Sequence, residues 1–145
     1  MASEDAIQRM VDETEIRNII ARIAIASDVG DLDEFASLYA GDATVQMRVV
    51  PGLPPDEGLE AILAGSRKRR ADGITGPGSG MVHAIQSSAI SVAGDEASAM
   101  TYVVLYRNGH ASPELSGILI YNDGFARTAE GWRLTSRCID PLPAG

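Results

Sequence analysis

The chain has 145 residues, a length typical of one domain, so we expect a single domain over residues 1–145. Its formal net charge of −8 disfavours nucleic acid and anionic membranes as partners, because both bind through excess positive charge. No apolar run reaches the roughly 20 residues that span a bilayer, and the single cysteine, Cys138, allows no intrachain disulfide, so we expect a cytoplasmic protein.

The first predicted helix covers residues 4–29 and carries an acid at its end. Isoleucines recur along it at steps of three and four residues, the period of a helix face that packs on a core. They are Ile16, Ile19, Ile20 and Ile23. Asp28 lies at the flank of this stripe, and Gly30 is a natural stop. Two roles for Asp28 stay open: a cap for the next helix, or an acid delivered into a pocket.

A second, short helix and a strand come next. Asp31, with Glu34 three residues later, resembles a capping box for a helix that carries Phe35, Leu38 and Tyr39. Residues 43–50 are rich in β-branched side chains and predict a strand, which the turn-forming stretch PGLPPDEG follows.

The third predicted helix, residues 59–70, ends in the basic run RKRR at residues 67–70. Cations in the last turn of a helix complement its dipole and usually face water. The alternative is a contact with an anion.

The rest of the chain predicts a sheet. Strand-like segments alternate with turn signals at the spacing of an antiparallel sheet. They cover residues 82–92, 97–107, 115–123 and 132–139. Helices followed by strands predict an α+β domain, in which three N-terminal helices pack on a long, curved, mainly antiparallel sheet.

The segment 97–107 is unusual because neither of its faces is plainly polar. One face would carry Ala97, Ala99, Thr101, Val103 and Leu105, and the other Met100, Tyr102, Val104 and Tyr106. A sheet that is apolar on both sides needs a second cover, and no helices remain to supply it. We therefore expect a homo-oligomer, a dimer or a trimer.

Few residues are candidates for chemistry. His83 opens the first long strand on a mostly apolar or small face, so its imidazole should point inward. It is either a satisfied core histidine or a base that needs a carboxylate partner, for which Asp28 is a candidate. A metal site from Asp28, His83 and His110 has little specificity, and we expect neither a metal nor a cofactor. Cys138 fits a small core residue better than a nucleophile.

The stretch EIRNIIARIAIASDVGDLDEFASLYAGDATV, residues 15–45, resembles the opening of SnoaL-like proteins of the nuclear transport factor two superfamily. The segments GLEAILA, MVHAIQSSAISVAGDEASA and GWRLTSRCID resemble the family's third helix, histidine-bearing strand and last strand. The resemblance covers nearly the whole chain, and it implies a cone-shaped α+β barrel.

The resemblance also implies a site. In the dehydratase-like branch, which includes scytalone dehydratase and bile-acid dehydratase, an Asp on the first helix and a His on the first long strand form a catalytic pair. Asp28 and His83 stand at these positions. His110 resembles a second active-site histidine, and Arg137 matches a position that in some members projects into the pocket.

One position departs from the dehydratase pattern. Several dehydratases carry an aromatic residue, often Tyr, five residues before the Asp, where this chain has Ile23. A hydroxyl donor to a substrate carbonyl must then come from elsewhere, and Tyr39, Tyr102 and Tyr106 are the candidates.

Two functions from different classes follow. The first is a cofactor-independent lyase, dehydratase-like, or an isomerase that acts on a hydrophobic, cyclic, oxygenated small molecule. The second is a non-catalytic binding protein or oligomeric scaffold, because fold alone decides no function. An open apolar pocket with Asp28 and His83 in hydrogen-bond reach would favour catalysis, and a pocket closed by side chains would favour the second.

Overall fold

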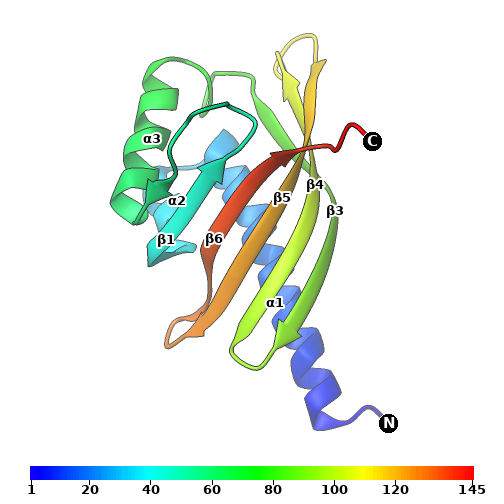
Figure 1. The fold of residues 1–145 in the computed structure, drawn as a ribbon. Coiled ribbons are helices and arrows are strands. Elements are labelled where there is room, and N and C mark those ends of the chain that lie inside the picture. The colour runs from blue at the N-terminus through cyan, green and yellow to red at the C-terminus, as the bar shows by residue number, and fades with distance from the viewer.

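The computed structural model describes residues 1–145, which form three helices on one curved sheet (Figure 1). The helices are α1 (Glu4–Asp28), α2 (Leu32–Ser37) and α3 (Leu59–Ala71). The strands are β1 (Tyr39–Met47), β2 (Asp56–Glu57), β3 (Val82–Ala93), β4 (Glu96–Arg107), β5 (Glu114–Thr128) and β6 (Gly131–Pro141). None of the helices combines the length and apolarity that a bilayer crossing requires.

The strands form one sheet in the order β2-β1-β6-β5-β4-β3. All neighbouring pairs are antiparallel except β1 and β6, which run parallel. Figure 1 shows α1 lying behind the long strands, with α3 beside the β1 end of the sheet. The predicted α+β architecture, three helices on a curved and mainly antiparallel sheet, is confirmed.

The core lies between α1 and the sheet. The isoleucine stripe of α1 is buried, as its period predicts, and it belongs to the same cluster as Phe125, Trp132 and Leu134 from β5 and β6. Burying each such side chain contributes about 1.5 to 3 kcal/mol. This packing fixes the end of α1, and with it Asp28, against the sheet.

A buried polar cluster ties the first half of α1 to the far end of the sheet. Asp12 is 3% exposed and accepts two hydrogen bonds from Arg127, at 2.8 and 2.9 Å, and one from the indole of Trp132 at 3.0 Å. The guanidinium of Arg127 holds the pKa of Asp12 well below its usual range. The carboxylate is therefore charged and fully partnered where it is buried.

The second helix and β1 differ from the prediction at their shared boundary. Asp31 caps α2 as expected, accepting from the backbone N–H of Glu34 at 2.7 Å. The helix ends at Ser37, however, and Tyr39 already belongs to β1, where it pairs with Leu134 of β6. This pairing with a strand from the far end of the chain overrides the local helix pattern.

The sheet strands are longer than predicted. β5 runs through Gly124 and Phe125, which the sequence assigned to a turn, and the register with β6 shifts between these two residues. Phe125 is 2% exposed, so its burial keeps the strand in the sheet, and Gly124 accommodates a bulge instead of a turn.

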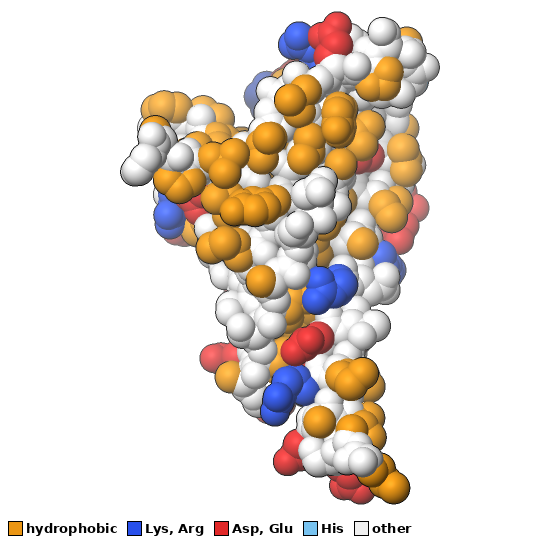
Figure 2. All heavy atoms as spheres, turned by 90° about the vertical axis from the view of Figure 1, so that its right-hand side faces the viewer, with side chains coloured by type: hydrophobic (Ala, Val, Ile, Leu, Met, Phe, Trp, Pro, Cys, Tyr) orange, Lys and Arg blue, Asp and Glu red, His pale blue; other side chains and the backbone are white.

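The outer face of the sheet, away from α1, is apolar at its centre. Five residues of β4 and β5, here called the outer patch, share this face: Met100, Tyr102, Val104, Ile118 and Ile120. Tyr102 pairs with Ile120 and Val104 with Ile118. Met100 and Tyr102 are about half exposed. Figure 2 shows hydrophobic side chains gathered on the upper half of the side that it presents.

Candidate active site

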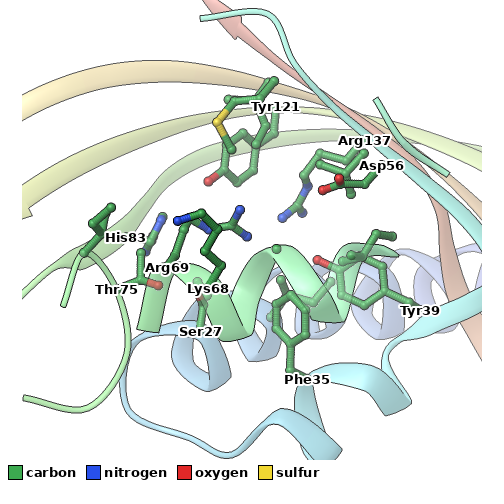
Figure 3. A pocket seen from close by; sticks show the side chains of 18 of the residues that line it. Ser27, Phe35, Tyr39, Asp56, Lys68, Arg69, Thr75, His83, Tyr121 and Arg137 are labelled. Carbon is green, nitrogen blue, oxygen red and sulfur yellow. The ribbon is translucent and has the colours of Figure 1, made fainter. Parts of the chain in front are cut away.

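A cavity of about 480 Å³ opens between the sheet, the end of α1 and α3. Apolar side chains form much of its wall, among them Ile23, Phe35 and Ile139. Polar side chains reach into it from opposite sides, with His83, Tyr121 and Arg137 on strands and Arg69 on α3 (Figure 3). The cavity has room for a small organic molecule with both apolar and polar parts.

Asp28 and His83 meet at one side of this cavity. Asp28 Oδ1 lies 2.6 Å from His83 Nδ1, and Oδ2 accepts the backbone N–H of His83 at 2.8 Å. The side chains are 11% and 17% exposed. Because Asp31 provides the cap of α2, the carboxylate of Asp28 is committed to His83.

This geometry determines how the imidazole presents itself. A carboxylate at Nδ1 favours the tautomer that carries its proton there, so Nδ1–H donates to Asp28. Nε2 has no hydrogen-bond partner in the protein, and His83 lines the cavity. The lone pair of Nε2 is thus available to take a proton from a bound molecule.

Arg70 stabilises the last turn of α1, which carries Asp28. Its Nη2 donates to the backbone oxygen of Ala26 at 2.8 Å and lies 3.5 Å from that of Ser27. A cation at the C-terminal carbonyls of α1 complements the helix dipole and ties α3 to the turn that ends in Asp28.

A buried ion pair forms another part of the wall. Arg137 makes two hydrogen bonds to Asp123, at 2.7 and 2.9 Å, and its guanidinium carbon lies 4.2 Å from the ring centre of Tyr121. Burial alone would lower the pKa of Arg137, but the charge and hydrogen bonds of Asp123 outweigh this and raise it. Arg137 is therefore a fixed cation whose charge Asp123 balances, and it holds the Tyr121 ring in place.

Two phenols face the cavity. Burial raises the pKa of Tyr39 to about 12 and also raises the pKa of Tyr121. Neither hydroxyl has a hydrogen-bond partner in the protein. Every fully buried side-chain oxygen has a partner, so these two hydroxyls are not fully buried, and they open on the cavity that both residues line. Phenols that stay protonated at neutral pH are hydrogen-bond donors to a ligand oxygen.

The candidate residues from the sequence fall into two groups. His83, Ile23, Tyr39 and Arg137 line the cavity, and Asp28 lies directly behind His83. Tyr102 lies on the outer face of the sheet. His110 is exposed in the β4–β5 connection, and its ring lies against Gly80, where a side chain would collide with it. Neither of these two is part of the cavity wall.

Several cavity residues were not predicted from the sequence. Tyr121 has the side-chain alternation of Asp123 and Phe125, and this period of two could have placed all three on one face of β5. Arg69 belongs to a basic run whose members the sequence does not distinguish, and Asp56 belongs to a turn-forming stretch, so neither was predicted to line the cavity. No group of three or more His, Cys, Asp or Glu side chains is arranged to hold a metal ion.

A family model described as a SnoaL-like domain matches residues 8–138. The chain belongs to the SnoaL-like family. Among solved structures, this SnoaL-like chain resembles an NTF2-like protein with a cystatin-like fold from Novosphingobium aromaticivorans, with 26% identity and a TM-score of 0.78. The match covers 96% of this chain and 87% of that chain.

Two further structures share the fold at lower identity. A candidate dehydratase of the NTF2-like family from Streptomyces avermitilis is 20% identical, with a TM-score of 0.76 over 94% of this chain and 99% of that chain. A candidate aromatic ring hydroxylase from Novosphingobium aromaticivorans is 23% identical, with a TM-score of 0.69 over 92% and 91%. No protein with a curated description matches the chain significantly.

Proposed function

We propose that this SnoaL-like protein is a cofactor-independent lyase of the dehydratase type, or an isomerase, that acts on a hydrophobic, cyclic, oxygenated molecule. The observation that carries the proposal is the Asp28–His83 pair, with Nε2 of the imidazole unpartnered at an open cavity. The name of the Streptomyces avermitilis neighbour, a candidate dehydratase, agrees with this assignment.

The first step is removal of a proton. Nε2 of His83 takes a proton from a carbon next to a substrate carbonyl, and Asp28 stabilises the imidazolium that results. The electrons of the broken C–H bond move toward the carbonyl oxygen, which becomes an enolate. Neither residue forms a bond to the substrate.

The enolate oxygen needs a donor. Tyr121 suits this role better than Tyr39, because Asp28 is among the charges that raise the pKa of Tyr121, in addition to its burial, so the phenol lies within the field of the pair. A protonated phenol fixed by Arg137 would hydrogen-bond the developing charge without reorganising.

The second step separates the two reaction types. In a dehydration the enolate re-forms the carbonyl, a C=C bond forms, and the neighbouring C–O bond breaks while the imidazolium returns its proton to the departing hydroxyl as water. In an isomerisation the substrate carries a C=C bond one carbon further along, so the enolate is a dienolate; the imidazolium returns the proton to its far carbon, and the C=C bond moves into conjugation with the re-formed carbonyl. Both routes leave His83 neutral and ready for the next turnover.

An assay of the first step tests the proposal directly. The probe is 1-tetralone, which has exchangeable protons next to a carbonyl on a fused ring, and NMR in D2O follows their loss. We expect the wild-type protein to accelerate this exchange and His83→Ala to abolish the acceleration, with a loss of about 10²- to 10⁴-fold. His110→Ala, outside the cavity, is the matched control and should retain the rate.

A His83→Ala variant that exchanges these protons as fast as wild type would overturn the proposal. A wild-type protein that binds 1-tetralone without accelerating exchange would favour a binding protein of the same fold instead.

A further inference from the structure

The four cations of the basic run at the end of α3 have four different environments. Arg67 is exposed to solvent. Lys68 pairs with Asp72 at 2.8 Å, and Arg70 is bonded to the end of α1. The remaining cation, Arg69, is half-buried and lines the cavity. Neither expectation for this run, water or an anion, therefore applies to all four residues.

Arg69 is the cavity cation that lacks an ion pair. Its hydrogen bond to a side chain is from Nη2 to Ser66 Oγ at 3.3 Å, and no carboxylate lies within the 4.0 Å of a salt bridge. Arg137, by contrast, has its charge balanced by Asp123. Figure 3 shows Arg69 reaching from α3 toward the space in front of the strands that carry Tyr121 and Arg137.

The electric field of Arg69 reaches across the cavity. Burial raises the pKa of both Tyr39 and Tyr121, and Arg69 is among the charges that pull these two pKa values back down. Arg69 lines the same cavity as these two phenols, so its guanidinium lies at the space that a bound molecule would occupy. Its donors are therefore available to a bound molecule.

Asp56 is a carboxylate of the cavity wall that could compete with a bound anion for Arg69. The two side chains flank the bare face of Gly65, where an added Cβ would lie 3.2 Å from Arg69 Nη1 and 3.4 Å from Asp56 Oδ2. They do not form an ion pair, so the guanidinium fork keeps free donors. Asp56 will nevertheless weaken, through its negative charge, the binding of any anion beside Arg69.

We propose that the cavity takes a substrate that carries a carboxylate group, which the guanidinium of Arg69 binds. The planar guanidinium matches a carboxylate with two parallel hydrogen bonds. The ring system of the substrate then lies against Ile23, Phe35 and Ile139, with its reacting carbon toward His83. This assignment rests on the proposed function only in taking the cavity as the substrate site.

Binding of a matched pair of probes tests the assignment without turnover. The probes are 2-naphthoate and its neutral isostere 2-naphthamide, neither of which has a C–H proton on the carbon next to its carbonyl. We expect calorimetry to show about tenfold tighter binding of 2-naphthoate, because one charge-assisted contact is worth about that factor. This preference should disappear in Arg69→Met and fall only in part in Arg69→Lys, which keeps the charge without the fork.

Two controls distinguish the contact from general charge and from catalysis. Arg67→Met removes the same charge from the exposed side of the same helix and should keep the preference. His83→Ala should also keep it, so a failed dyad and a failed Arg69 site give different results. Asp56→Asn should strengthen 2-naphthoate binding by removing the competing charge.

Three results would overturn the assignment. One is equal affinity of the wild-type protein for the two probes, another is a preference that survives in Arg69→Met, and the third is no binding of 2-naphthoate at millimolar concentration. Comparing the thermal unfolding of Arg69→Met with that of wild type shows whether the variant is folded. If it is not, Arg69→Lys tests the preference for 2-naphthoate with a smaller change in structure.

Discussion

Asp28 holds His83 through both of its carboxylate oxygens, one on the imidazole Nδ1 at 2.6 Å and the other on the backbone N–H at 2.8 Å. The backbone contact fixes the carboxylate relative to β3, and the imidazole contact fixes the ring relative to the carboxylate. Because Asp28 is on α1 and His83 on β3, the orientation of the base depends on how these two elements pack.

Asp28→Asn should therefore change the tautomer of His83. The Asn oxygen can keep the backbone N–H, which turns its NH2 group toward Nδ1 and makes that nitrogen an acceptor. The ring proton then moves to Nε2, and the nitrogen at the cavity can no longer take a proton. We expect the two ¹⁵N signals of His83 to exchange character in NMR of the neutral ring, with unchanged thermal stability. Retention of the Nδ1–H form in the variant would contradict this interpretation.

Tyr121→Phe should slow proton exchange without loosening the fold. The substitution removes the phenol that faces the cavity and keeps the ring that packs against Arg137. Losing one donor to a developing oxyanion costs about 10²- to 10³-fold in rate. The 1-tetralone assay measures this, and Tyr102→Phe on the outer face is the matched control that should leave the rate unchanged. If both variants lose the same rate, the role of Tyr121 is not that of an oxyanion donor.

The fold was largely predictable because its signals are local. The isoleucine stripe of α1, the Asp31 cap and the alternating strands each depend on residues close in sequence. The boundaries that differed depend on distant partners. Tyr39 joins β1 through Leu134 of β6, and Phe125 extends β5 because it is buried in the core.

The site was only half predictable for the same reason. An acid at the end of an apolar helix and a histidine on an apolar strand face made Asp28 and His83 candidates, and the resemblance to the SnoaL-like family paired them. Which phenol faces the cavity depends on strand register, and this placed Tyr121 inside and Tyr102 outside. Successive helix positions are about 100° apart, so the neighbours Arg69 and Arg70 have different environments that composition cannot separate.

The outer patch should be covered by a second copy of the chain. Met100 and Tyr102, both on β4, are 51% and 45% exposed, and contiguous apolar surface that is open to water marks an interaction site. We expect sedimentation at micromolar concentration to show a dimer or a trimer, and Tyr102→Glu to shift it toward monomer. Ile25→Glu, at an exposed apolar position of α1, is the control that should leave the assembly intact. A wild-type monomer under these conditions would refute the prediction.

Asp12→Asn should destabilise the protein in a pH-dependent way. The hydrogen bond from Arg127 holds the pKa of Asp12 below its ordinary value of 3.8, so the folded state binds this proton less readily than the unfolded state. The stabilisation is fully present above pH 3.8 and is lost as the pH falls through the folded pKa. Removing one partner of a fully buried ion pair costs about 3 to 5 kcal/mol. Because Arg127 is partly exposed, we expect the free energy of unfolding at pH 7 to fall by less, about 2 to 3 kcal/mol. Urea unfolding should show that the difference in unfolding free energy between wild type and Asp12→Asn becomes smaller as the pH is lowered.

The matched control for Asp12 is Asp95→Asn. Asp95 bonds the same guanidinium at 2.9 Å, but its side chain is 82% exposed. Water screens such a pair, so its loss should change stability much less. Equal losses from the two variants would mean that Arg127, and not the burial of Asp12, sets the stability of this cluster.

Gly30→Ala should destabilise the end of α1 where Asp28 is held. The sequence predicts Gly30 as the stop of the helix, and Gly30 does not adopt the positive φ that many such glycines have. Its role is space: an added Cβ would lie 2.7 Å from the backbone Cα of Ala26, which cannot move aside. We expect a loss of about 2 to 3 kcal/mol in urea unfolding, in the upper range for overpacking, and slower exchange of 1-tetralone because Asp28 shifts with the turn. Gly41→Ala, where an added Cβ meets nothing within 4 Å, should leave both measurements near wild type. A Gly30→Ala variant as stable as Gly41→Ala would show that the turn after Asp28 can move without cost, and that the packing of α1 alone positions the acid.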